Sequence, residues 1–118
     1  MSFPPLLVGS IYIILLHVLV WFSANGQFIK ENNFFSNHAL LFAMGVGPII
    51  GFLGYQGSKI IYTALEGSVW QIRFFGFGLS YLVFPILTWM ILGESMFTTK
   101  TLVCIFLSFL ILFIQVYF

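Results

Sequence analysis

Residues 102–118, with the sequence LVCIFLSFLILFIQVYF, form an apolar run without a single charged side chain. A run of this length can cross a bilayer as one α-helix, because about 20 residues span the hydrocarbon core. Three further apolar stretches precede it in the chain. The sequence therefore predicts an all-α integral membrane protein, with residues 1–118 as a single membrane domain and spans at about 6–28, 39–64, 70–92 and 101–118.

The composition excludes a water-soluble domain. Of the 118 residues, 61% are hydrophobic and only 6% are charged, whereas about a quarter of an ordinary soluble domain is charged. Because no water pairs backbone groups inside the hydrocarbon, each span is expected to be an α-helix, and the alternation typical of barrel strands is absent. We expect a four-transmembrane-helix bundle, paired as a dimer within the lipid bilayer.

The basic residues are balanced between the two sides of the membrane. Lys30 and Lys100 belong to the first and third connectors, whereas Lys59 and Arg73 flank the second. The positive-inside rule therefore assigns no orientation. This pattern is expected of proteins that insert both ways and pair antiparallel, and also of small subunits oriented by a partner. A net charge of +1 gives no basic stripe, so nucleic acid is excluded as a partner.

The sequence contains no complete catalytic or metal-binding motif. A nucleophile, a base and an orienting group do not occur together, and no glycine-rich phosphate loop follows a strand. Cys104 is the only cysteine, so it can form neither an internal disulfide nor a multi-cysteine metal site. We expect no enzymatic activity, no cofactor and no metal.

Small residues form a row on one face of the second span. Their spacings of four, three and four residues place Gly47, Gly51, Gly54 and Ser58 on that face. Such a face allows close backbone approach. It either packs helices together within one chain or lines a surface along which a substrate passes.

A polar stripe on the adjoining face runs from the middle of the second span toward the second connector. It contains Tyr55, Lys59, Tyr62 and Glu66 at helical spacing. Ionisable groups at membrane depth are costly and usually functional, although Lys59 is near enough to the helix end to reach the interface as an anchor. Glu66 is its nearest candidate charge partner, and Arg73 lies close to this pair across the short second connector.

His17 is the most central polar residue of the first span and shares a helical face with Ser10 and Asn25. An imidazole titrates near neutral pH, so His17 could accept a transported proton. The alternative is a hydrogen bond to a neighbouring helix.

The third and fourth spans carry two further patterns. Gly76, Gly78 and Pro85 permit a bend in the third span, because proline leaves one backbone carbonyl without its helical donor. This bend is either a hinge for alternating access or a packing adjustment. In the fourth span, a narrow small and polar face is predicted to join a second copy or another subunit; it consists of Thr101, Cys104, Ser108 and Gln115.

The region from Gly76 to Gln115 resembles the C-terminal part of drug/metabolite superfamily transporters. It has Gly-x-Gly at 76–78, Trp89, Leu-Gly-Glu at 92–94, a short polar connector and a closing apolar helix. Length and span number look like the small multidrug resistance family. That resemblance implies an antiparallel homodimer of four-helix chains that exchanges cations for protons, with the fourth helix at the interface. The first span lacks that family's glutamate, so a different solute, including a lipid-linked or uncharged one, fits better.

These patterns favour a small four-helix transporter that works as a homodimer, with His17, Lys59, Tyr62 and Tyr81 along the substrate path. The alternative is a non-catalytic accessory or structural subunit of a larger membrane complex, and a channel, holin or immunity-type protein is a third class. The default location is the inner membrane of a bacterium, with an organelle membrane as the alternative.

Overall fold

The computed structural model describes residues 3–29, 34–65 and 68–117, and every regular element in these ranges is helical. The long helices are α1 (Phe3–Asn25), α3 (Ala39–Ala64), α4 (Val69–Leu87) and α5 (Thr99–Tyr117). Three short elements accompany them, namely η1 (Gly26–Phe28), α2 (Phe34–Asn37) and the π-helical turn η2 (Thr88–Leu92).

Four of the described segments are long and apolar enough to cross a membrane. They are Pro4–Phe28, Ala39–Ala64, Val69–Leu92 and Thr99–Tyr117. Their bounds lie close to the spans expected from the sequence, and the second coincides with the expected 39–64. The chain is therefore an all-helical, multi-pass membrane protein.

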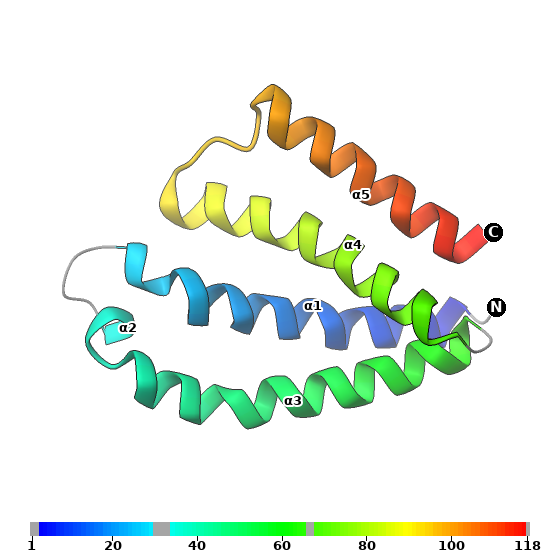
Figure 1. Ribbon diagram of the computed structural model, residues 1–118, viewed down its shortest axis with the longest axis horizontal. Coiled ribbons are helices and arrows are strands. Elements are labelled where there is room, and N and C mark those ends of the chain that lie inside the picture. Colours follow the sequence, from blue (N-terminus) through cyan, green and yellow to red (C-terminus); the bar gives the residue numbers. More distant parts are fainter. Residues whose placement is uncertain (1–2, 30–33, 66–67, 118) are drawn as a thin grey trace.

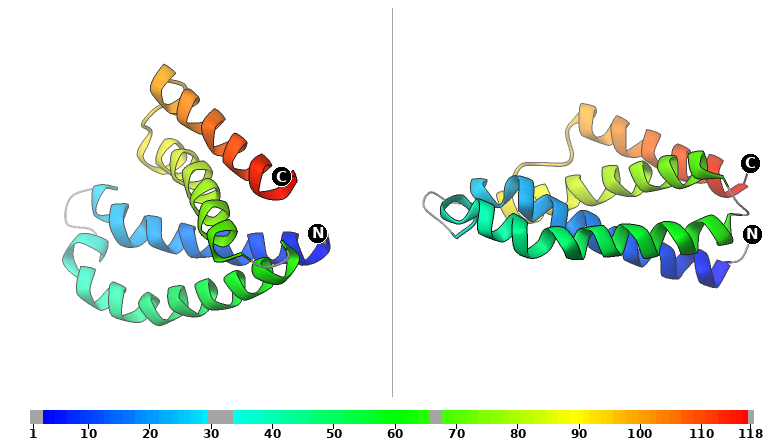
Figure 2. Two further views of the ribbon diagram at one scale, coloured as in Figure 1. Left: turned by 45° about the vertical axis from the view of Figure 1, so that its right-hand side comes forward. Right: turned by 60° about the horizontal axis from the view of Figure 1, so that its bottom comes forward.

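The long helices lie side by side in the order α3, α1, α4, α5 (Figures 1 and 2). Helix α1 packs extensively on both α3 and α4, and α4 also packs on α5, whereas α3 and α4 touch only slightly. The layer measures 46 × 36 × 20 Å, and its thickness is about two helix diameters. The four expected spans are thus present, arranged as an open layer in which α3 and α4 touch only slightly.

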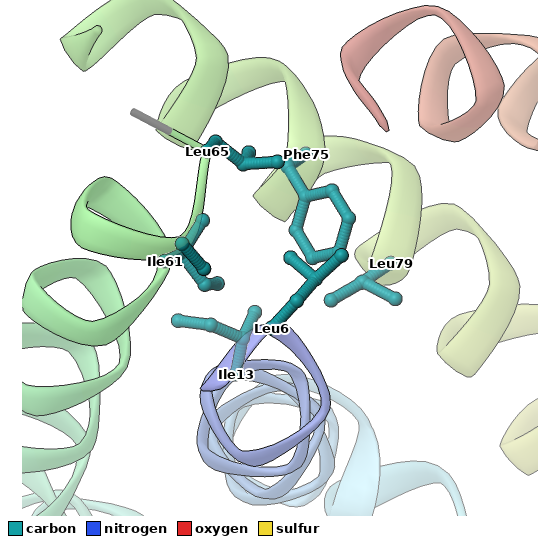
Figure 3. Close-up of a cluster of buried hydrophobic side chains, with 7 residues drawn as sticks. Leu6, Ile13, Ile61, Leu65, Phe75 and Leu79 are labelled. Atoms are coloured by element: carbon teal, nitrogen blue, oxygen red, sulfur yellow. The ribbon is translucent and has the colours of Figure 1, made fainter. Parts of the chain in front are cut away.

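The lipid environment explains why the layer can stay open. Apolar helix faces gain nothing by leaving lipid hydrocarbon, so no hydrophobic force closes the bundle. The largest buried cluster is small and lies where α1, α3 and α4 meet. Figure 3 shows its side chains converging from the three segments, with Leu6 and Ile13 from α1, Ile61 and Leu65 from the end of α3, and Phe75 and Leu79 from α4.

Two glycines allow α1 and α3 to approach closely. A Cβ atom added to Gly9 would lie 2.6 Å from Cγ1 of Ile61 and 3.3 Å from the carbonyl oxygen of Gly57. A Cβ added to Gly57 would lie 2.8 Å from Cδ1 of Ile13. Both glycines are buried. The closest contacts between α1 and α3 therefore involve glycines beside the predicted small-residue row.

A similar contact joins α4 to α5. A Cβ added to Gly78 would lie 2.8 Å from Cδ2 of Leu112 and 3.4 Å from the carbonyl oxygen of Ser108. Ser108 is only 1% exposed, and its hydroxyl donates to the Cys104 carbonyl oxygen at 2.9 Å. Bonding within its own helix satisfies the buried hydroxyl, so the two helices can pack tightly.

The α1–α3 contact predicts a clear difference between two leucine substitutions in α3. Gly57→Leu forces a side chain into α1 and should lower the free energy of unfolding by about 1–3 kcal/mol. Gly47→Leu adds the same side chain where no atom lies within 4 Å of an added Cβ, so it should not destabilise the chain. Thermal unfolding of both variants in the same detergent tests this prediction. Equal destabilisation would contradict the observed α1–α3 contact.

Candidate functional site

A groove with a volume of about 360 Å³ lies between α1, α3 and α4. We call it the central groove. Most of its wall is apolar, but four polar or small features interrupt that wall: the His17 ring, the Ser58 hydroxyl, the Arg73 guanidinium and the bare backbone at Gly54 and Gly76. The remaining lining residues are Ile13, Leu16, Val69, Ile72 and Phe77.

His17 connects α1 to α4. Its Nε2 atom lies 3.1 Å from the carbonyl oxygen of Gly76, and because a carbonyl only accepts, Nε2 must carry the proton. The ring also meets Phe84 edge-on, with centroids 6.4 Å apart. His17 therefore bonds to a neighbouring helix, as in one of the two interpretations left open by the sequence, and it also lines the central groove.

Arg73 enters the groove from the first turns of α4. Its guanidinium carbon lies 5.1 Å from the centre of the Phe77 ring, which is one turn further into the span. Phe77 also lines the groove, so the contact places the cation over an aromatic ring at the groove wall.

Lys59 and Tyr62 line a second depression of about 400 Å³, which we call the lateral groove. It shares Gly54, Ser58 and Ile72 with the central groove, so the two are adjacent. Lys59 and Tyr62 are both exposed. Three of the four predicted path residues thus lie in adjoining grooves between the first three long helices.

Tyr81, the fourth predicted path residue, lies elsewhere. It lines a depression between α4 and α5 together with Pro85, Lys100 and Cys104, among others. Glu66, the predicted charge partner of Lys59, lies outside the described residues. Arg73, which was predicted to lie close to that pair, lines the adjoining central groove rather than the same depression as Lys59.

The predicted row of small residues divides into two parts. Gly54 and Ser58 line both grooves, and a Cβ added to Gly54 would lie 3.1 Å from Cδ1 of Leu16. An added Cβ at Gly47 or Gly51 meets nothing within 4 Å. Packing within the chain therefore does not involve these last two positions.

The predicted bend region of the third span is a continuous helix until after Pro85. Gly76 accepts the His17 hydrogen bond, and Gly78 packs on α5. The irregularity comes at η2, directly after α4, where the π-helical turn follows the proline. The donor missing at Pro85 affects the carbonyl of Tyr81, on the other side of the proline from η2, so the two irregularities are separate.

Trp21 makes a contact between α1 and η2 that the sequence did not reveal. Its side chain is fully buried. Its Nε1 atom donates to Oγ1 of Thr88 in η2 at 3.0 Å. The irregular turn brings this hydroxyl acceptor to α1, and helical periodicity alone could not predict it.

Only part of the predicted dimer face of α5 is exposed. Ser108 is buried against α4 within the same chain, so its side chain is not available to a second copy. Cys104 is exposed, and Gln115 is half-buried. Thr101 accepts a hydrogen bond from the Thr98 hydroxyl at 2.9 Å. The other exposed side chains of α5 are mostly apolar, and they include Phe106 and Leu107.

The fold and the groove define a multi-pass membrane protein with a small polar site between its first three spans. Among residues 3–29, 34–65 and 68–117, no group of three or more His, Cys, Asp or Glu side chains is arranged to hold a metal ion. No protein-family model, curated protein or solved structure matches the chain.

The central groove should be accessible to a small polar thiol reagent. In a Cys104→Ser background, Ser58→Cys should react readily with a methanethiosulfonate, because Ser58 lines two open grooves. Ser108→Cys is the matched control, and it should react much more slowly because that position is 1% exposed. Equal rates at the two positions, measured by mass spectrometry, would show that the groove is closed to solutes.

Proposed function

We propose that the protein is a small four-helix transporter of the drug/metabolite type, which moves a small or lipid-linked solute by alternating access as a homodimer. The observation that carries this proposal is the polar groove between α1, α3 and α4. Its wall contains His17, Ser58 and Arg73 in an otherwise apolar layer. Ionisable groups at membrane depth are costly to keep, and they commonly mark solute pathways.

The order of the helices supports a homodimer with α5 at the contact. Helix α5 lies at one edge of the layer, on the side of α4 away from α3 (Figure 1). Helix α5 exposes large apolar side chains, including Phe106 and Leu107. Pairing through this edge would leave the central groove of each copy open for a solute.

The irregular end of the third span supports a conformational change. Pro85 removes one backbone hydrogen bond, and the π-helical turn η2 follows it. Such turns often occur at functional sites, and helices bend most readily where the regular hydrogen-bond ladder is interrupted. In a transporter cycle, bending here would move the half of α4 that lines the groove relative to η2.

The side chains also bear on the solute. The first span contains no Asp or Glu, so a cation and a proton cannot compete there for a carboxylate. His17, Lys59 and Arg73 are instead the ionisable side chains of the two grooves. This set favours a solute other than a cationic drug.

A second candidate is an accessory subunit of a larger membrane complex, and the exposed side of α3 favours it. None of the most apolar part of α3 is buried, and Gly47 and Gly51 leave open space beside the helix. A helix from another protein could pack closely against this surface.

Orientation and assembly distinguish the two candidates. In a Cys104→Ser background, Ser68→Cys and Ser95→Cys place single thiols in the second and third connectors, at opposite ends of the layer. Because the basic residues are balanced, the transporter proposal predicts that each thiol reacts from both sides of the membrane in intact cells and that the purified chain is a homodimer. Labelling from one side only, with stability that depends on other polypeptides, would support the accessory subunit instead.

A further inference from the structure

The two adjoining grooves contain an excess of positive charge. Arg73 lines the central groove and Lys59 lines the lateral groove, and they come from different helices. No aspartate or glutamate is among the described residues that line either groove. Cations at membrane depth are normally paired or placed where an anion can reach them.

The positions of the two cations along their helices indicate their depth in the membrane. Lys59 is five residues from the end of α3 and Arg73 is four residues from the start of α4, so both lie about 6–8 Å inside their helix ends. The 26 residues of α3 extend over about 39 Å, which exceeds the hydrocarbon thickness of about 30 Å. The two cations therefore lie near the boundary between hydrocarbon and headgroups.

Both side chains lie where a ligand between the helices can meet them. The Arg73 guanidinium lies over the Phe77 ring, and both residues line the central groove. Lys59 lies near the C-terminal end of α3, and since helical side chains lean toward the N-terminus, its stem starts into the membrane. Both cations thus lie where they can meet a ligand between the helices.

We propose that these grooves bind the phosphate-bearing headgroup of an amphiphile, which is then the substrate class of the transporter. This inference rests on the proposed function. The planar guanidinium of Arg73 can donate two parallel hydrogen bonds to phosphate oxygens, and Lys59 adds a point charge. Ser58 and Tyr62 line the lateral groove with Lys59, and their hydroxyl groups are neutral hydrogen-bond donors.

The groove walls explain why the ligand is an amphiphile. The central groove has an apolar surface that suits a hydrocarbon chain. This surface is formed by Ile13, Leu16, Ile72 and Phe77. Because α3 and α4 touch only slightly, the grooves open along the side of two membrane-spanning helices, where the surroundings are lipid. A lipid can enter by this route without leaving the bilayer.

The binding test uses the full chain in phosphatidylcholine nanodiscs that contain increasing fractions of phosphatidic acid. Binding to the folded state raises the midpoint of thermal unfolding, which gives an apparent affinity. Arg73→Gln should weaken this affinity about tenfold, as expected for losing hydrogen bonds to a charged group. Lys59→Gln should weaken it less, and Arg73→Lys should retain part of it.

Lys100→Gln is the matched control, since it removes one positive charge from a residue that lines the α4–α5 depression instead. It should bind phosphatidic acid as the unmodified chain does. The inference is overturned if Lys100→Gln weakens binding as much as Arg73→Gln, or if phosphatidic acid stabilises no more than phosphatidylcholine. Should Arg73→Gln fail to fold in phosphatidylcholine alone, Lys59→Gln and Arg73→Lys supply the comparison.

Glycerol 3-phosphate in solution distinguishes a lipid from a soluble phosphate. The inference predicts that it stabilises the chain far less than phosphatidic acid, and equal stabilisation would contradict the amphiphile as ligand. This equilibrium measurement is independent of dimer formation and orientation. Binding without a homodimer would reject the proposed transporter, whereas a dually oriented homodimer that does not bind would reject only this substrate class.

Discussion

Lipid hydrocarbon supplies neither hydrogen bonds for the backbone nor a hydrophobic gain when two apolar helices meet. Each span must therefore satisfy its own backbone, and contacts between spans depend on close packing and a few polar bonds. In this chain, close packing occurs at Gly9 and Gly57 between α1 and α3, and at Gly78 and Ser108 between α4 and α5. Helix α1 is the element that joins the two pairs.

The join between α1 and α4 relies on two polar contacts, His17 with Gly76 and Trp21 with Thr88, together with the small apolar cluster in Figure 3. Each hydrogen bond of this kind contributes only about 0.6 kcal/mol on average within a membrane. Because these contacts are weak, the interface between α1 and α4 can rearrange at a small cost in free energy. The central groove lies beside this interface, and His17 belongs to both. Movement of α4 against α1 would therefore change the shape of the groove.

Much of the fold follows from the sequence because length and apolarity alone determine which segments can cross a bilayer. The segment Ala39–Ala64 is an example, since it coincides with the expected span. The order of the helices could not be predicted in this way, because apolar faces are equally stable against lipid or protein. The sequence did not predict Gly57 as a packing position, because it lies one residue away from the row of small residues that helical spacing identified.

The site was only partly predictable. Helical spacing grouped Lys59 with Tyr62, and depth in the span singled out His17, but only the packing of α1 between α3 and α4 brings His17 near Arg73. Tyr81 lines the depression between α4 and α5 instead of the two grooves. The hydrogen bond of Trp21 could not be predicted, because its partner Thr88 lies in the π-helical turn after Pro85.

The central claim is that the groove between α1, α3 and α4 carries a phosphate-bearing amphiphile across the bilayer. The most direct measurement is the transbilayer movement of a fluorescent short-chain phosphatidic acid in proteoliposomes, followed by quenching of the outer leaflet with dithionite. The account predicts faster movement with the protein than in protein-free liposomes, a slower rate with Arg73→Gln and an unchanged rate with Lys100→Gln. A rate equal to that of protein-free liposomes would contradict it.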